Sequence, residues 1–173
     1  MYSYATFHKS SSSPEGTVHA GGYENIAAEG EASQIDDYES WASAGSGRAI
    51  DGNTDGNWKN SELNSISLTN SREGAWWKLS FPRPYFVYSM EIYNRVDDFE
   101  ERIENVEVSV GDKLVSTLKY EVGKNLYSLE NVAMVGLEIV FRRRQGLMQL
   151  AEVMVFGEPA IPSKISPMCA VFV

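Results

Sequence analysis

The sequence is poor in cysteine and histidine, and it has no long apolar run. Its single cysteine is Cys169, so no internal disulfide framework can form. The two histidines, His8 and His19, both lie near the start of the chain. No segment is long enough to cross a bilayer as a helix, and no basic segment followed by an apolar one resembles a secretory signal. These absences exclude a disulfide scaffold and a helical membrane protein, and they leave the compartment open between the cytoplasm and unconventional secretion.

Positive charge is also scarce. The formal net charge of −9 opposes sequence-independent attraction to nucleic acid and to anionic lipid, since both require a surplus of Lys and Arg. We therefore expect no nucleic-acid partner and no membrane insertion. The one basic run, residues 142–144, interrupts two strand-like segments just before Gly146, and we interpret it as a solvated loop.

The apolar content is high enough for one folded domain, because hydrophobic residues make up 43% of the 173 residues. Residues 1–23 are rich in Ser and Gly without any period, which predicts a flexible leader. Residues 24–158 carry the strand-like patterns and form the predicted domain. Residues 159–173 contain three prolines and are predicted to be a C-terminal tail.

Short strand-like runs separated by Gly, Asn, Asp and Pro predict an all-β domain, an antiparallel β-sandwich of the jelly-roll kind. The clearest runs are residues 75–81, 86–93, 106–110, 114–120, 135–141 and 147–156. In 106–110 Val alternates with Glu and Ser, which indicates one buried and one solvated face. No helical period is sustained, so we expect short helical turns only. Glu152 lies among apolar residues, where a lone carboxylate is costly and requires compensation.

Groups suited to catalysis are few. No histidine lies within the predicted domain, and no Gly-rich phosphate loop or zinc-ligand spacing is present. The acidic residues around Asp97 and Asp98 lie beside two arginines, whose charge opposes the raised pKa that a general acid needs. The sequence therefore favours a binding module over an enzyme.

Five stretches, in this order and spacing, resemble the F-type lectin domain of the discoidin-like superfamily. They are residues 24–27 (ENIA), 49–53 (AIDGN), 76–79 (WWKL), 94–97 (NRVD) and 152–157 (EVMVFG). The resemblance implies a discoidin-like jelly-roll sandwich with a loop region stapled by calcium. It also implies binding of fucosylated or other glycans, an extracellular location, and self-association of single-site domains to gain avidity.

The resemblance places Arg95, Asp97 and Arg102 in a sugar-binding motif. A guanidinium is a rigid fork of donors that can grip a ring oxygen and a neighbouring hydroxyl, and Asp97 would orient one fork. Trp58 and Phe99 would supply an apolar wall for the methyl group of fucose. Two alternatives stay open: the charged residues form a surface ion-pair cluster, or Trp58 is an ordinary core residue.

Two positions depart from the family pattern. Leu68 occupies the place of a motif histidine, and residues 98–99 (Asp-Phe) replace an adjacent cysteine pair. Leucine cannot hydrogen-bond, and the loss of such a partner costs about 1–3 kcal/mol. These departures weaken the expectation of fucose specificity. With Leu68 and Phe99 taken as loop-tip residues, they also leave open a discoidin-like adhesion domain that binds a protein, another glycan or a lipid headgroup.

The resemblance further implies a calcium site. Its side-chain ligands would be Asp51, Asn53, Ser65 and Glu152, with the main-chain carbonyls of Arg48 and Ala151. Calcium prefers about six to eight hard oxygen ligands, and a cation would compensate the buried carboxylate of Glu152. The alternative is a loop without metal, in which Asp51 caps its own turn and Glu152 pairs with an arginine.

Overall fold

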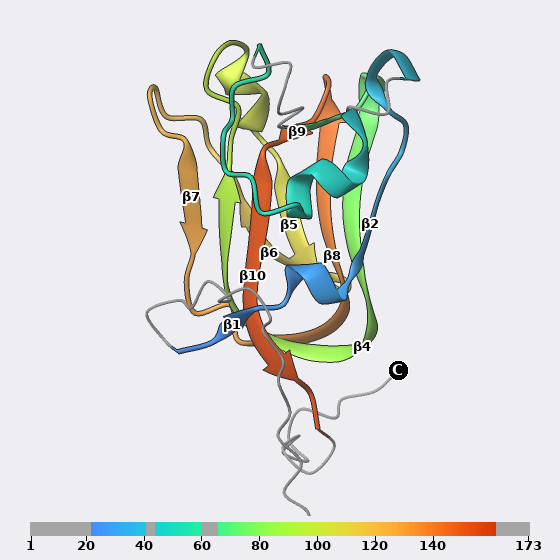
Figure 1. Cartoon of the computed structure of the whole chain (residues 1–173), viewed down its shortest axis with the longest axis vertical. Helices are drawn as coiled ribbons and strands as arrows, with labels where there is room; N and C mark the ends of the chain where they lie inside the picture. The colour runs from blue at the N-terminus through green and yellow to red at the C-terminus, as the bar shows by residue number, and fades with distance from the viewer. Residues whose placement is uncertain (1–21, 41–43, 60–65, 162–173) are drawn as a thin grey trace, which may run out of the picture.

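Two layers of antiparallel strands, joined by one long strand, make up the part of the chain that the structure describes (Figure 1). This computed structural model describes residues 22–40, 44–59 and 66–161. Its strands are β1 (Glu24–Asn25), β2 (Glu31–Gln34), β3 (Ser67–Leu68), β4 (Glu73–Tyr93), β5 (Glu107–Val110), β6 (Lys113–Thr117), β7 (Leu126–Leu129), β8 (Met134–Gln145), β9 (Gln149–Leu150) and β10 (Glu152–Pro159). Its 3-10 turns are η1 (Ala27–Glu29), η2 (Tyr38–Ser40), η4 (Ser46–Ile50) and η5 (Glu100–Ile103).

Strand β4 belongs to both layers. Its first part pairs with β2 and β8, and its last part pairs with β7 and β10. Between them the strand bends at the lower end of the molecule in Figure 1. The ladder to β8 is irregular between Ser80 and Tyr85, the segment that contains Pro82 and Pro84. Proline has no N–H to donate, so it is tolerated where ladder pairing is interrupted.

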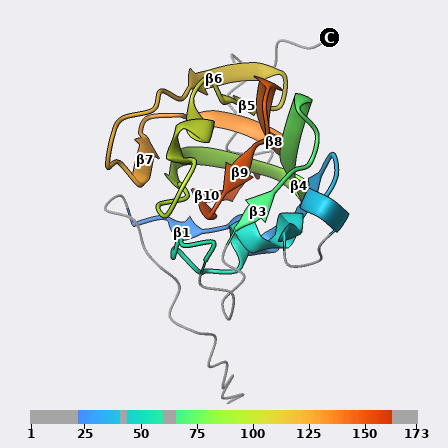
Figure 2. The same cartoon turned by 90° about the horizontal axis from the view of Figure 1, so that it is seen from above.

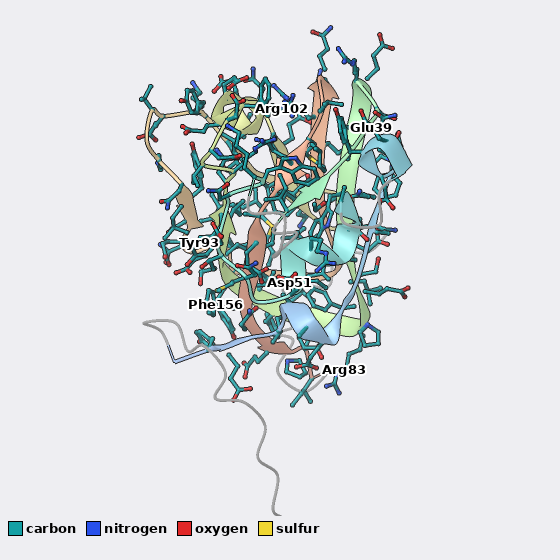
Figure 3. All side chains as sticks on the ribbon, turned by 45° about the horizontal axis from the view of Figure 1, so that its top comes forward. Glu39, Asp51, Arg83, Tyr93, Arg102 and Phe156 are labelled. Atoms are coloured by element: carbon teal, nitrogen blue, oxygen red, sulfur yellow. The ribbon has the colours of Figure 1, made fainter. Side chains whose placement is uncertain are left out.

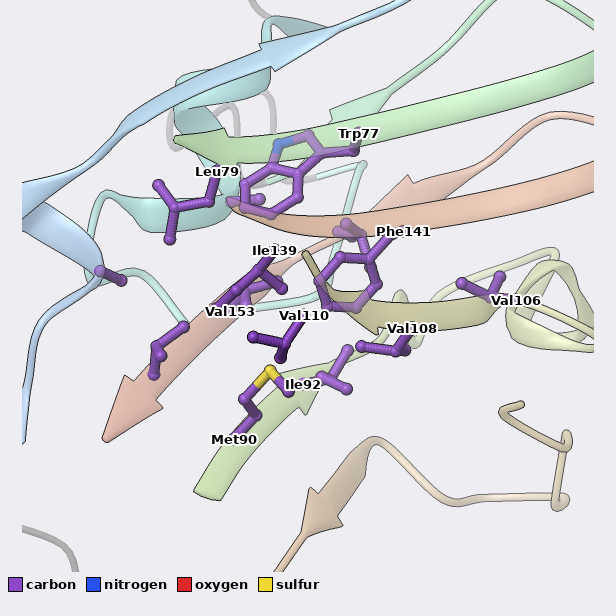
Figure 4. Close-up of a cluster of buried hydrophobic side chains, with 14 of the residues drawn as sticks. Trp77, Leu79, Met90, Ile92, Val106, Val108, Val110, Ile139, Phe141 and Val153 are labelled. Carbon is purple, nitrogen blue, oxygen red and sulfur yellow. The ribbon is translucent and has the colours of Figure 1, made fainter. Parts of the chain in front are cut away.

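The core lies between the two layers (Figure 4). Trp77 from β4 and Phe141 from β8 are fully buried and meet edge to face, with ring centroids 5.4 Å apart. Met90 and Ile92 from the last part of β4 face them together with Val153 of β10. Burial of a large apolar side chain contributes about 1.5–3 kcal/mol, so this cluster provides most of the driving force for folding.

The predicted fold class is confirmed: the described residues form antiparallel sheets with 3-10 turns and no α-helix. The alternation predicted for 106–110 is also confirmed, because Val108 and Val110 are buried while Glu107 and Ser109 are partly exposed. The runs 75–81 and 86–93, predicted as two strands, are one continuous strand.

Other expectations are wrong or incomplete. Residues 142–144 are not a loop but the last part of β8, because they continue its pairing with β4. Strand β7 and the short strands β1, β2 and β3 carry no clear apolar period, and the sequence patterns missed them. Most of the predicted leader and tail lies outside the described residues, so the predicted domain boundaries stay predictions.

The strands β3 and β9 cross one end of the sandwich, as the view from above shows (Figure 2). They pair only with each other, and Leu68 lies opposite Gln149. The loops after η4 and after β4 gather at the same end, so this end brings distant parts of the chain together. No helix in the described ranges is long and apolar enough to cross a membrane.

Candidate functional site

The predicted sugar-binding residues come together at the loop end of the sandwich. Arg95 and Asp97 follow the end of β4, and Arg102 lies in η5 directly after them. Trp58 comes from a separate loop, residues 51–59, that packs beside them. Figure 3 shows Arg102 at this end and Arg83 at the opposite end.

Arg95 and Asp97 form a buried ion pair. Arg95 Nε donates to Asp97 Oδ1 at 2.6 Å and Nη2 donates to Oδ2 at 3.3 Å. The side chains are only 5% and 7% exposed, so the alternative of a surface ion-pair cluster is wrong for these two residues. Burial acts to raise the pKa of Asp97, but the hydrogen bond and charge of Arg95 outweigh it and hold that pKa below its ordinary value. The pair is therefore charged and fixed.

One donor of Arg95 is left over for a ligand. Its Nη1 makes no hydrogen bond with any described residue, and it is not among the buried side-chain atoms that lack a partner. Asp97 thus holds two nitrogens of the guanidinium and orients the third. This is the geometry in which an arginine can recognise a ligand oxygen at low entropic cost.

Two guanidinium groups contact the ring of Phe99. Arg95 Cζ is 5.5 Å from the centre of its ring, and Arg102 Cζ is 4.1 Å from the same ring. Both distances are within the range of a cation–π contact. Phe99 has a left-handed backbone, with φ of 56°, and its side chain is 44% exposed. The loop therefore presents a partly exposed aromatic ring with two cations in contact with it.

Gln149 is a structural partner of the site that the sequence patterns missed. Its Nε2 donates to the carbonyl of Phe99 at 2.7 Å, and its Oε1 accepts from Arg102 Nη1 at 3.4 Å. It is 1% exposed, so this amide is withdrawn from water and fully used. The available signal was a single amide between Met148 and Leu150, a polar group in an apolar run that requires partners.

Leu68 is buried in the small cluster against which Trp58 packs, and it does not lie at a loop tip. It is 2% exposed and packs with Ala44 and Leu147, and Trp58 lies partly buried against this cluster. The placement of Leu68 among exposed loop residues is therefore wrong. Trp58 packs on this small core and lies 5.8 Å from the Arg95 guanidinium, and its role as a wall for the sugar stays a prediction.

The loop carrying Trp58 is organised by its own side chains. Asp51, Asn53, Asp55 and Asn57 each accept a hydrogen bond at 3.0 Å from the backbone N–H two residues further on. Such Asx turns fix a loop without regular secondary structure. The last of these donors, Lys59 N, also donates to Asp97 Oδ2 at 3.2 Å, which attaches the loop to the buried ion pair.

Gly56 allows this loop to touch the backbone beneath it. A Cβ at this position would lie 2.3 Å from the carbonyl oxygen of Asn94 and 3.2 Å from Arg95 Cα. We therefore expect Gly56→Ala to destabilise the protein by about 1–3 kcal/mol, as overpacking does. Urea denaturation is the measurement. Gly47→Ala is the control, since a Cβ there meets nothing within 4 Å, and an equal loss in both variants would contradict the prediction.

Asp51 and Glu152 approach each other on the side of the loop that faces β10. Glu152 is 1% exposed, and its Oε2 accepts a hydrogen bond from Gly52 N at 3.2 Å. Burial, followed by the charge of Asp51, raises the pKa of Glu152 to about 8. No arginine forms an ion pair with Glu152 in the part of the chain that the structure describes, whereas Asp51 does cap its own turn. Of the two contacts in the metal-free alternative, the cap by Asp51 is therefore present, and the pairing of Glu152 with an arginine is absent from the described residues.

These residues fit a hard cation. The buried carboxylate of Glu152 lies beside Asp51 and has no positive partner among the described residues. A divalent ion would stabilise a carboxylate in such an environment. No cluster of three or more His, Cys, Asp and Glu side chains exists within the described ranges, so the remaining ligands would be amide, hydroxyl and carbonyl oxygens. Of the other predicted ligands, Ala151 directly precedes Glu152 in the chain and Asn53 follows Asp51 by two residues. Ser65 lies outside the described residues.

Arg48 lies in the last turn of η4, next to the loop of residues 51–59. Its side chain is 3.6 Å from Asp51 Oδ2, an ion pair between partly exposed groups at the end of η4. The turn η4 is itself fixed to the core, because Trp77 Nε1 donates to the carbonyl of Ser46 at 2.9 Å. The carbonyl of Arg48 as a calcium ligand stays a prediction.

Comparisons with known sequences identify similar proteins. Residues 48–134 match the family model described as a NedA-like, galactose-binding domain of the F5/F8 type C group. The chain is 33% identical over 95 residues to a fucolectin of Anguilla anguilla, a match that covers 54% of this chain and 58% of that protein. The chain spans about half the length of the curated relatives it matches.

Solved structures with the same fold include lectins. An F-lectin (fucolectin) from Morone saxatilis serum superposes with a TM-score of 0.70 at 26% identity, covering 81% of this chain and 51% of that one. A fucose binding module of Streptococcus pneumoniae superposes with a TM-score of 0.67 at 26% identity, covering 79% of this chain and 97% of that one.

Proposed function

Because the chain belongs to the family of NedA-like, galactose-binding domains and is an F-type lectin domain within it, we propose that it is a carbohydrate-binding lectin without enzymatic activity. The ligand proposed is L-fucose or a related saccharide. The observation that carries the proposal is the gathering of two guanidiniums, those of Arg95 and Arg102, at the exposed ring of Phe99.

The chemistry of this arrangement suits a monosaccharide. A sugar has an apolar face made of C–H groups, which packs on an aromatic ring, and a rim of hydroxyls, which accept hydrogen bonds. Phe99 offers the ring, Arg95 offers Nη1, and Arg102 offers the nitrogens that Gln149 does not occupy. The ring of Trp58, 5.8 Å from Arg95 Cζ, would supply a second apolar surface.

We propose that calcium holds the loop of residues 51–59 to β10. Asp51 and Glu152 would supply carboxylates, with oxygens of Asn53, Ser65, Arg48 and Ala151 completing the shell. When bound, the cation would neutralise Glu152, and the loop that carries Trp58 would be fixed at both ends. The proposal is supported by the burial of Glu152 beside Asp51.

The departures at Leu68 and at residues 98–99 bear on specificity. Leu68 is buried beneath Trp58, so it provides packing and no hydrogen bond to the ligand. We therefore propose an affinity for free L-fucose lower than that of a site with a third polar group. Self-association, which would raise the avidity of such a site, stays a prediction.

Isothermal titration of the calcium-loaded protein with L-fucose, beside D-galactose, tests the proposal. We expect saturable heat with L-fucose and an affinity at least about tenfold lower in Arg102→Gln, because a hydrogen bond from a charged donor contributes about 1.5–3 kcal/mol. Arg72→Gln, on the exposed turn before β4, is the control and should bind like the wild type. The absence of heat with both sugars would refute L-fucose and D-galactose as ligands of the site.

A further inference from the structure

Arg102 and Arg143 differ from the other described arginines. Each of the two is partly withdrawn from water, and neither forms an ion pair with a carboxylate of the described residues. The remaining ones are either paired with an acid or exposed: Arg48, Arg83, Arg95 and Arg144 are paired, and Arg72 and Arg142 are exposed. A partly buried guanidinium without an anion is a costly arrangement, so these two require an explanation.

Arg143 points toward the loop end of the sandwich. In the β4–β8 ladder it lies opposite Ala75, which is fully buried, and it follows the buried Phe141 by two residues. Residues two apart on a strand share a face, so Arg143 belongs to the inner face while Arg142 and Arg144 belong to the outer one. Its Nη1 donates to the carbonyl of Leu147, which fixes the side chain beside the Leu68 cluster.

The two guanidiniums act on each other electrostatically. Burial and then the charge of Arg95 lower the pKa of Arg102, and the charge of Arg143 contributes in the same direction. Burial also lowers the pKa of Arg143, and the attraction of Glu101 and Glu104 does not offset it. Both cations are therefore less stabilised in the protein than in water, and a negative group near them would relieve this.

Arg143 is accessible from a groove that begins at Glu104, two residues after Arg102. The groove has a volume of about 540 Å³, and its lining also includes Asn105, Glu107, Thr117, Arg144 and Gln145. All of its lining side chains are polar or charged, as expected for a ligand rich in hydroxyls and not for an apolar one.

The nearby carboxylates are already engaged or lie in solvent. Glu104 Oε2 accepts from Tyr120 N at 2.6 Å, and Glu107 is paired with Arg144 at 2.9 Å. Glu101 is exposed. Arg102 and Arg143 are the cations along this path that form no ion pair with a described carboxylate.

We propose that the lectin site accepts a saccharide that carries an anionic group, a carboxylate or a sulfate, and that Arg143 binds this group beside Arg102. This inference rests on the proposed function and specifies its ligand class. The sugar ring would pack at Phe99 and Arg95, and its charged substituent would lie toward the groove. Arg143 is thus a specificity-determining residue, which selects charged over neutral sugars.

The test is titration of the calcium-loaded protein with D-galactose, D-galacturonic acid, D-galactose 6-sulfate and L-fucose. The first three share one ring stereochemistry and differ in the substituent at C6, so their comparison isolates the charge. We expect at least one of the two anionic sugars to bind at least about tenfold more tightly than D-galactose, and the preferred one distinguishes carboxylate from sulfate. The preference should fall as sodium chloride is raised, because salt screens the pair.

Arg143→Gln should remove this preference and leave L-fucose binding within about twofold of the wild type. Arg143→Lys, which keeps the positive charge, should retain part of the preference for anionic sugars. Arg142→Gln is the matched control, since Arg142 is exposed on the outer face and should change neither ligand. Thermal denaturation of each variant separates a loss of binding from a loss of folding.

Two results would overturn the inference while the proposed function stands. One is L-fucose binding without any preference for the anionic sugars over D-galactose. The other is a preference that persists in Arg143→Gln, which would assign the anion to another residue. If no sugar binds to the folded protein, the proposed function and the inference both fail.

Discussion

Arg95→Ala is expected to abolish saccharide binding and to lower the free energy of unfolding by about 3–5 kcal/mol, the usual cost of removing one member of a buried ion pair. The reason is that Arg95 and Asp97 are both almost entirely buried and share two hydrogen bonds. Without the guanidinium, the carboxylate of Asp97 stays buried with backbone donors alone. Urea denaturation and titration with L-fucose are the two measurements.

The control for this variant is the ion pair of Arg144 and Glu107. Arg144 is 84% exposed, and exposed pairs contribute about 0–1 kcal/mol, so Arg144→Ala should be nearly neutral for stability. The double variant Arg95→Ala with Asp97→Ala should recover part of the lost stability, because it removes the orphaned charge. Normal stability and normal fucose binding in Arg95→Ala would show that the pair is not the centre of the site.

Calcium is expected to raise the melting temperature by about 5–10 °C when its concentration is about a hundredfold above Kd. A ligand that binds only the folded state stabilises it by about 2.7 kcal/mol at that ratio, and each kcal/mol corresponds to about 2–4 °C for a chain of this size. The physical source is the neutralisation of Glu152 beside Asp51. Scanning calorimetry in calcium and in chelator is the measurement.

Glu152→Gln distinguishes a metal site from a merely buried acid. The variant replaces an acid whose ionised form is unfavourable in this buried position by a neutral amide of the same shape, so in chelator it should be as stable as the wild type or more stable. In calcium it should show no increase in melting temperature. Glu138→Gln, which alters a partly exposed carboxylate paired with Lys78, should keep the full response to calcium. An equal response in the wild type and in Glu152→Gln would exclude Glu152 as a ligand.

The sequence by itself determined the class of fold and predicted which residues gather at the loop end. The Val pattern of 106–110 and the turn residues between apolar runs were enough for an all-β sandwich, because side-chain alternation follows directly from strand geometry. The family resemblance was enough to predict that Asp97 orients an arginine of the motif, and the structure pairs it with Arg95 in the same short loop. The alternating Asp and Asn of residues 51–57 form Asx turns, which are local interactions and depend on sequence neighbours only.

Tertiary structure alone decided which residues are buried at the site and which way the arginines point. Leu68 looked like a loop residue because its strand is two residues long, and the contacts that bury it come from distant segments, namely β9, Ala44, Leu147 and Trp58. The sequence alone does not distinguish the three consecutive arginines, Arg142, Arg143 and Arg144. The register of β8 on β4 sends the middle one to the inner face, and that register is set by core contacts such as Trp77 against Phe141. Such long-range pairings depend on the packing of segments far apart in the chain, so no local pattern encodes them.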